Sequence, residues 1–283
     1  MGNQEWEEKV TAFKTHLLEE ERTALTIRKY LHDIDCFFGW LETQGWDGSE
    51  LAKEMIIAYK GYLMKNYKIT SANSMITALN RFFRFCRLHD LCIKNYKVQR
   101  QYFRKESEEL TKEEYRKLAE KAEELGKTRL LLLIQTLACT GIRIRELGGL
   151  TVESVREGKI EIYNKGKWRE VYLPRKLRQE LMKYCKEQGI ITGPVILTNN
   201  ERVPDRVNVW NMLKRLAKAA GVPTSKVYPH NFRHLFAFSY YEVDKDLAHL
   251  ADLLGHSNVE TTRRYTIRTL SSEEETIEKM GMI

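Results

Sequence analysis

Four short segments of the chain carry side chains that suit chemistry on a phosphate group. They are TGIRIREL (140–147), NKGK (164–167), PHNFRH (229–234) and LLGHSNVETTRRYT (253–266). Arginine forks bind pairs of phosphate oxygens, and histidine can donate to or accept from the same centre. Prearranged donors of this kind stabilise the negative charge that a phosphoryl-transfer transition state gathers. Together the segments indicate metal-free phosphoryl transfer to a tyrosine, with this set of residues: Arg143, Lys165, His230, Arg233, His256 and Tyr265.

Each of these residues also has an ordinary interpretation when it is taken alone. An arginine in a turn or a lysine at a hairpin tip is usually a solvated charge, and a lone tyrosine usually packs. His230 and His234 have the spacing of a zinc site, but Asn231 stands where a metalloprotease needs glutamate, and no third ligand follows. A metal-dependent nuclease needs clustered carboxylates, and the two D-x-D pairs of the chain lie outside the four segments. We therefore expect no metal and no other cofactor.

The first hundred residues have the hydrophobic periodicity of helices. Four helices are predicted: around Trp6 to Leu17, behind a cap at Thr23 or Thr26, over about 51–67, and behind a cap at Thr70 or Ser71.

The chain loses this periodicity over 91–109, which predicts a linker between two domains. Thr111 followed by Glu114 is a capping box that starts the second domain. Apolar and polar residues alternate on both sides of 164–167, which predicts a β-hairpin with Lys165 at its tip. Helices are predicted at about 112–125, 127–140, 175–188, 205–220, 230–242, 245–254, 258–265 and 272–280, with a short one through Arg145 to Leu147. The expected fold is mainly α with a small β-sheet (α+β), with a helical domain over 1–105 and a second domain over 106–283.

Positive charge is concentrated in one part of the chain. The net charge is +8, but residues 1–59 hold 6 Lys and Arg against 12 Asp and Glu. Residues 60–105 hold 11 Lys and Arg against Asp90 alone, and aromatic residues are interleaved with them. This pattern suits a polyanion such as nucleic acid, although a solvated basic face around core helices would look the same. The candidate DNA contacts are Arg81, Arg84, Lys94, Lys97 and Arg100.

Composition narrows the class of protein further. The 283 residues are 42% hydrophobic and 30% charged, which suits a folded chain with a substantial core. The five cysteines form no CxxC pair, so a disulfide framework is not expected and a reducing cytoplasm fits best. The longest apolar run is far short of the roughly 18 residues of a membrane helix, so we expect no membrane partner.

With these four motifs in this order, the sequence resembles the tyrosine recombinases, the phage-integrase family of site-specific recombinases. It is most similar to the compact Xer-like members with two domains. The resemblance covers nearly the whole chain: 1–105 would be the core-binding domain, with a basic linker at 91–105, and 106–283 the catalytic domain with a C-terminal exchange helix.

The resemblance implies a role for each motif residue. Arg143 and Arg233 would clamp the phosphate, with Glu146 ordering the site. His230 would act on the proton of the tyrosine, and His256 would donate to a non-bridging oxygen. Lys165 would protonate the leaving 5′-oxygen, and Tyr265 would be the nucleophile.

The reaction implied is integration or recombination of DNA by strand exchange through a 3′-phosphotyrosyl intermediate, without metal or ATP. The implied partners are double-stranded DNA with an inverted-repeat core site and three further copies of the chain. These would form a tetramer on two sites through exchange of the C-terminal helix. Such a protein, whether chromosomal or from a mobile element, is expected in the cytoplasm of a prokaryote, associated with the nucleoid.

Two other functions remain open at this point. A type IB topoisomerase-like enzyme uses similar chemistry to relax supercoils, and a non-catalytic DNA-binding regulator could share the fold. The complete set of six motif residues argues against the regulator, and the predicted helix after Tyr265 argues for assembly of several copies.

Overall fold

The computed structural model describes residues 2–48, 50–97, 108–164, 166–256, 258–263 and 278. These residues form helices and one two-stranded antiparallel sheet, which confirms the predicted fold class. Contacts within the chain divide it into two compact units, Met1–Arg100 and Gln101–Ile283. Each unit is described by itself.

The first unit is built from four helices and a short 3₁₀ turn. They are α1 (Gly2–Glu19), α2 (Ala24–Thr43), α3 (Lys53–Asn66), α4 (Ile69–Phe85) and η1 (His89–Leu91). α2 begins at a predicted cap, because the Thr23 hydroxyl accepts from the Thr26 amide. The predicted caps of α4, Thr70 and Ser71, are wrong. The N-cap is Lys68, which makes no side-chain cap bond, and both predicted caps lie in the first turn. Packing of the buried face that begins at Ala72 sets this start.

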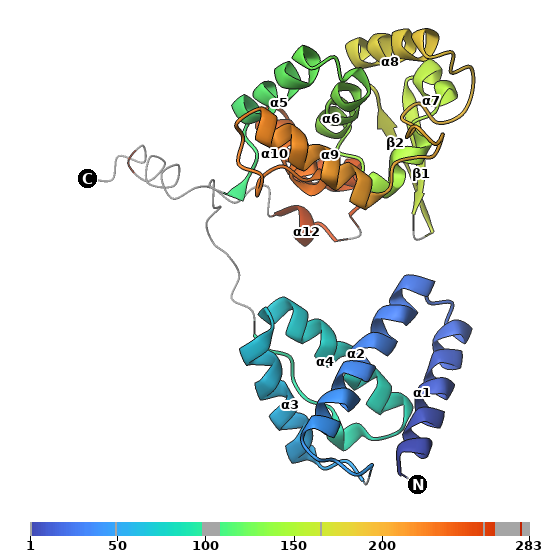
Figure 1. Ribbon diagram of the computed structural model, residues 1–283, viewed down its shortest axis with the longest axis vertical. Helices are drawn as coiled ribbons and strands as arrows, with labels where there is room; N and C mark the ends of the chain where they lie inside the picture. The colour runs from blue at the N-terminus through green and yellow to red at the C-terminus, as the bar shows by residue number, and fades with distance from the viewer. Residues whose placement is uncertain are drawn as a thin grey trace. The chain divides into compact units, whose positions relative to one another are not determined.

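Aromatic side chains fill the core of this unit. In Figure 1, α1 and α3 flank α2 and α4 on opposite sides. Phe37, Phe82 and Phe83 are fully buried between them. After η1 the chain runs back along α4, where two asparagine side chains hold it. Asn80 donates to the carbonyl of Ile93 at 2.7 Å and accepts from its amide at 2.9 Å, and Asn73 binds Tyr96 in the same way.

The second unit begins at the predicted capping box, where the Thr111 hydroxyl and the Glu114 carboxylate each accept the backbone amide of the other residue. Its elements are α5 (Lys112–Glu124), α6 (Thr128–Thr140), η3 (Ile144–Gly149), α7 (Val152–Glu157), β1 (Lys159–Asn164), β2 (Lys167–Tyr172), α8 (Arg175–Glu187), α9 (Arg206–Ala219), α10 (Pro229–Val243), α11 (Leu247–Leu254) and α12 (Glu260–Arg263). Helix α7 was not predicted.

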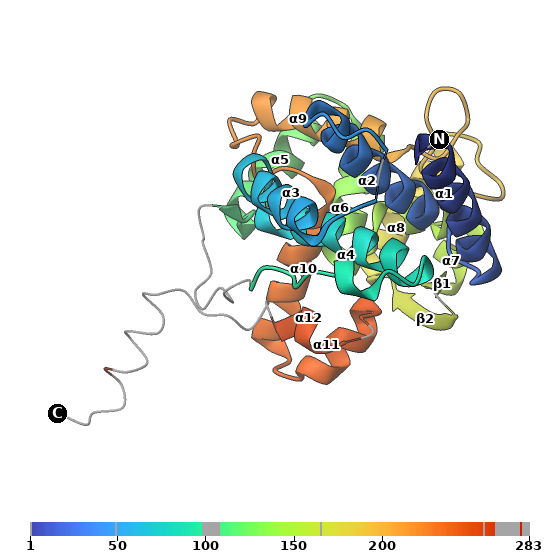
Figure 2. The same cartoon turned by 90° about the horizontal axis from the view of Figure 1, so that it is seen from below.

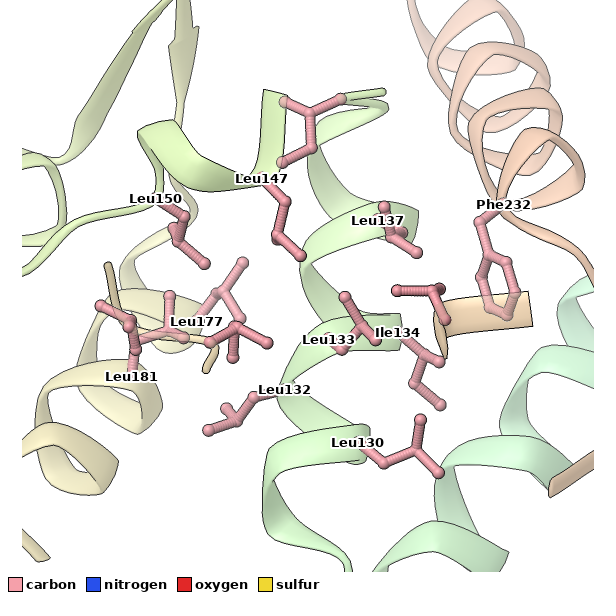
Figure 3. Close-up of a cluster of buried hydrophobic side chains, with 14 of the residues drawn as sticks. Leu130, Leu132, Leu133, Ile134, Leu137, Leu147, Leu150, Leu177, Leu181 and Phe232 are labelled. Atoms are coloured by element: carbon pink, nitrogen blue, oxygen red, sulfur yellow. The ribbon is translucent and has the colours of Figure 1, made fainter. Parts of the chain in front are cut away.

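The leucine-rich helix α6 is the centre of this unit. Figure 3 shows side chains of α6 from Leu130 to Leu137 between Leu177 and Leu181 of α8 on one side and Phe232 of α10 on the other. Burial of α6 on both sides fixes where its C-terminal end lies, and the first of the four motifs begins there.

The hairpin β1–β2 has the predicted alternation, with Tyr163 paired to Trp168 next to its tip. Ile160, Ile162 and Val171 face the core. Figure 2 shows α11 and α12 side by side. Hydrogen bonds from Arg233 to Leu254 and His256 place the last motif beside the third. Within the described part of the chain, no helix is long and apolar enough to cross a membrane.

Candidate active site

The first motif turns sharply at the end of α6. Gly141 caps this helix with φ +61°, in the left-handed region that glycine adopts without strain. A side chain here would be blocked as well, because an added Cβ would lie 2.4 Å from Cδ1 of Phe236. The turn leads directly to Arg143, the N-cap residue of η3.

Glu146 holds Arg143 in place. Its carboxylate accepts from the Arg143 amide at 2.7 Å and from the Arg143 guanidinium at 2.9 Å. The Glu146 side chain is 8% exposed, whereas that of Arg143 is 27% exposed. The site therefore presents the cation to solvent and keeps its counter-ion inside.

Arg169 of β2 is a second cation on the same carboxylate and was not among the predicted site residues. Its guanidinium donates to Glu146 at 2.5 Å and to the Leu253 carbonyl at the end of α11. The signal was present in the hairpin: Arg169 pairs with Ile162, on the face that otherwise carries buried aliphatic side chains. A charge at such a position needs a buried partner.

Among the described residues of the motifs, Arg233 is the most deeply buried charged residue, at 1% exposure. It lies on α10, which begins with Pro229 at its first position. Its guanidinium donates to the Gly141 carbonyl at 2.6 Å and to the Leu254 carbonyl. Arg169 and Arg233 thus satisfy two carbonyls in the last turn of α11, groups that a helix leaves without an internal partner.

His256 follows directly after this turn. Gly255 is left-handed with φ +62°, and an added Cβ would meet the Arg169 side chain at 2.7 Å, so only glycine fits. Nε2 of His256 lies 3.1 Å from the Arg233 guanidinium, and Nδ1 lies 2.7 Å from the hydroxyl of Thr262. Thr262 is fully buried in α12 and was also not among the predicted site residues.

The surroundings of His256 keep its ring neutral at neutral pH. Burial first, and then the nearby Arg233, Arg143, Arg169 and His230, together lower the pKa of His256 from 6.5 to about 4. His230 is exposed on α10, one turn before Arg233, with its ring against that of His234. Asn231, between them, is buried and donates to the carbonyls of Glu108 and Lys226, which is a structural role. Among the described residues, no group of three or more metal-ligating side chains occurs.

The structure therefore brings four of the predicted residues together: Arg143, Glu146, Arg233 and His256, with His230 within electrostatic reach. Lys165 and Tyr265 lie outside the described residues. Three arginines lie close to His256, and two of them, Arg143 and Arg169, share the Glu146 carboxylate. The site therefore carries excess positive charge and suits an anion such as a phosphodiester.

The candidate DNA contacts of the first unit differ in their environments. The Arg81 guanidinium is paired with Glu20, which offsets part of its charge. Arg84 and Lys94 line one groove of about 530 Å³ beside Thr77 and Asn95. Lys97 is exposed, and Arg100 lies outside the described residues.

Comparisons with known proteins agree with this arrangement. Residues 108–270 match the model of the phage integrase family, and residues 10–89 match the phage integrase N-terminal SAM-like domain. The chain is 30% identical to tyrosine recombinase XerA of Thermococcus kodakarensis, over 98% of this chain and 96% of that protein. It is 29% identical to tyrosine recombinase XerD of Pseudomonas aeruginosa, over 88% of each.

Solved structures show the same fold. A crystal structure of XerA recombinase matches 97% of this chain and 98% of that chain with a TM-score of 0.54 and 26% identity. A lambda integrase dimer bound to a COC′ core site matches 92% of this chain and 76% of that chain with a TM-score of 0.72 and 18% identity. A lambda integrase tetramer bound to a Holliday junction matches 89% and 77% with a TM-score of 0.70 and 19% identity.

Proposed function

The chain belongs to the phage integrase family of tyrosine recombinases, and from this premise we propose that it cuts and rejoins DNA at specific sites by way of a covalent tyrosine intermediate. The observation that carries the proposal is the convergence of Arg143, Arg233 and His256 from three separate motifs onto one cationic centre. Arg143 is partly exposed and His230 is exposed, so a phosphate can reach the centre from solvent.

The proposed reaction is a transesterification. The Tyr265 oxygen attacks the scissile phosphorus, the bond to the 5′-oxygen breaks, and Lys165 gives that oxygen a proton. His230 acts on the tyrosine proton, while Arg143, Arg233 and His256 stabilise the charge on the non-bridging oxygens. The 3′-phosphotyrosyl link keeps the energy of the broken bond, so a 5′-hydroxyl of a partner strand can rejoin the DNA without ATP.

We propose that the substrate is double-stranded DNA with an inverted-repeat core site and that four copies of the chain act on two such sites. The similarity of fold to a lambda integrase tetramer on a Holliday junction supports this assembly. The segment proposed for helix exchange follows Tyr265, and the structure describes only Glu278 of it. A chromosomal substrate would place the protein in a prokaryotic cytoplasm, on the nucleoid.

A nicked duplex tests the function directly. The protein's site is first found by footprinting genomic fragments, and a nick next to the cleavage position then lets the cut strand diffuse away. Wild-type protein should become covalently attached to this DNA, and Tyr265→Phe should bind it but form no adduct. An adduct with Tyr265→Phe would move the nucleophile elsewhere, with Tyr240 or Tyr241 the next candidates.

The same substrate separates the other functions. A regulator would form no adduct at all. A topoisomerase-like enzyme would form an adduct and relax supercoils but would not exchange strands between two duplexes, whereas the proposed recombinase exchanges them.

A further inference from the structure

The hydrogen bonds of His256 fix the position of its proton in this structure. A guanidinium can only donate, so Nε2 of His256 accepts from Arg233 at 3.1 Å. A neutral imidazole then carries its single proton on Nδ1, and it donates that proton to the Thr262 hydroxyl at 2.7 Å.

This tautomer is the opposite of the one that the proposed reaction uses. To donate to a phosphate oxygen from the side that faces Arg233, His256 needs a proton on Nε2. When DNA binds, the Arg233 N–H that donates to Nε2 would donate to the phosphate instead, while the bonds to the Gly141 and Leu254 carbonyls stay in place. The ring then requires a partner that supports a proton on either nitrogen.

Thr262 is such a partner. A hydroxyl accepts from Nδ1–H in one tautomer and donates to a bare Nδ1 in the other. Thr262 is fully buried, so water does not easily replace it. It also lies in α12, three residues before Tyr265, so the bond ties His256 to the segment that leads to the nucleophile.

We propose that Thr262 is a positioning residue whose hydroxyl orients His256 and lets the ring change from the Nδ1–H to the Nε2–H tautomer when phosphate binds. Nδ1 releases one proton and Nε2 gains one, with solvent as the carrier, so the charge of the ring does not change. The role of His256 in this inference rests on the proposed function, whereas its starting tautomer rests on the two hydrogen bonds alone.

The first test needs no variant and no DNA. Nitrogen NMR of the full chain with labelled histidine distinguishes the protonated from the bare ring nitrogen. His256, assigned by its absence in His256→Asn, should show the proton on Nδ1 above pH 6. A proton on Nε2 in the DNA-free protein would overturn the proposal.

The second test uses the nicked duplex described above. Thr262→Val keeps the shape but loses the hydroxyl, and it should slow adduct formation by about 10- to 100-fold with unchanged DNA binding. Thr262→Ser should stay within about threefold of wild type. Thr261→Val, an exposed neighbour in the same helix, is the matched control and should have no effect.

A double-mutant cycle separates a positioning role from a merely structural one. In a His256→Asn background, Thr262→Val should cost no further activity, because its effect passes through the ring. An equal further loss in that background, or failure of Thr262→Ser to restore the rate, would refute the inference. If the wild-type chain itself forms no adduct, the proposed function fails instead, and the NMR result still decides the tautomer.

Discussion

Replacement of Arg169 by methionine tests whether its buried ion pair with Glu146 stabilises the second unit. The two side chains are 10% and 8% exposed, and their atoms are 2.5 Å apart. Methionine keeps an unbranched apolar stem but removes the charge and the donors to Glu146 and Leu253. Glu146 would keep its two bonds to Arg143, and the Leu253 carbonyl would lose the Arg169 donor.

The size of the effect follows from these contacts. Loss of one partner from a buried ion pair costs about 3–5 kcal/mol when the remaining charge is left alone. Because Arg143 still pairs with Glu146, we expect a smaller loss of about 2–4 kcal/mol in the free energy of unfolding, including the lost bond to Leu253. For a unit of this size each kcal/mol lowers Tm by about 2–4 °C, so Tm should fall by about 4–16 °C.

Calorimetry of the full chain without DNA measures this effect. Arg169→Met, Glu146→Gln and the double variant form a cycle, and their coupling energy should be about 1.5–3 kcal/mol. The control is Arg116→Met. Arg116 is 68% exposed, and its ion pair with Glu113 is long, at 3.9 Å. Its loss should change stability by less than about 0.5 kcal/mol. Single effects that add to within about 0.5 kcal/mol would refute the reasoning.

Four further predictions address the reaction and the assembly. Lys165→Ala should slow cleavage of ordinary DNA far more than cleavage of DNA with a 5′-bridging sulfur, which leaves without a proton; equal losses would show that Lys165 is not the general acid. Neutralising three basic residues should reduce the slope of log affinity against log salt by up to about 2–3 units, since each phosphate contact contributes about 0.9, and an unchanged slope would place the DNA elsewhere. These residues are Lys94, Lys97 and Arg100. Deletion of 271–283 should leave binding to one site intact but abolish strand exchange; recombination at the normal rate would rule out exchange of this segment. The pKa of His256 is about 4 in the folded chain and 6.5 in the unfolded chain, so between these pH values the folded state binds fewer protons. The contribution of His256 to stability is therefore fully present above pH 6.5, and it falls by up to about 1.4 kcal/mol per pH unit toward pH 4. His256→Asn should lack this part of the slope in urea titrations at several pH values, and an identical slope would contradict the assignment.

The sequence predicts those elements whose signals are local. The capping box at Thr111, the left-handed Gly141 and the hairpin around 164–167 each depend on residues within a few positions of one another. Helix α7 escaped prediction because it has only six residues, too few for a hydrophobic period to show.

The parts of the site that were missed depend on contacts between distant segments. Arg169 lies 23 residues from Glu146 and 84 from Leu253 along the chain. Thr262 is only six residues from His256, but its role depends on the turn at Gly255 that brings the two side chains together. Motif residues are recognisable by type and spacing, whereas their supporting partners are determined by the folded chain.

The burial of Arg233 has a consequence for which catalytic residues can be lost while the chain still folds. The guanidinium joins the ends of α6 and α11 to α10, so a chain without it loses part of its fold as well as a phosphate ligand. Arg143 has one buried carboxylate partner and is partly open to solvent, so its loss harms cleavage more selectively. In a lineage that keeps the protein for DNA binding alone, selection for folding would preserve Arg233 after Arg143 has drifted. A relative with Arg233 but without Arg143 is therefore expected to fold but not to exchange strands.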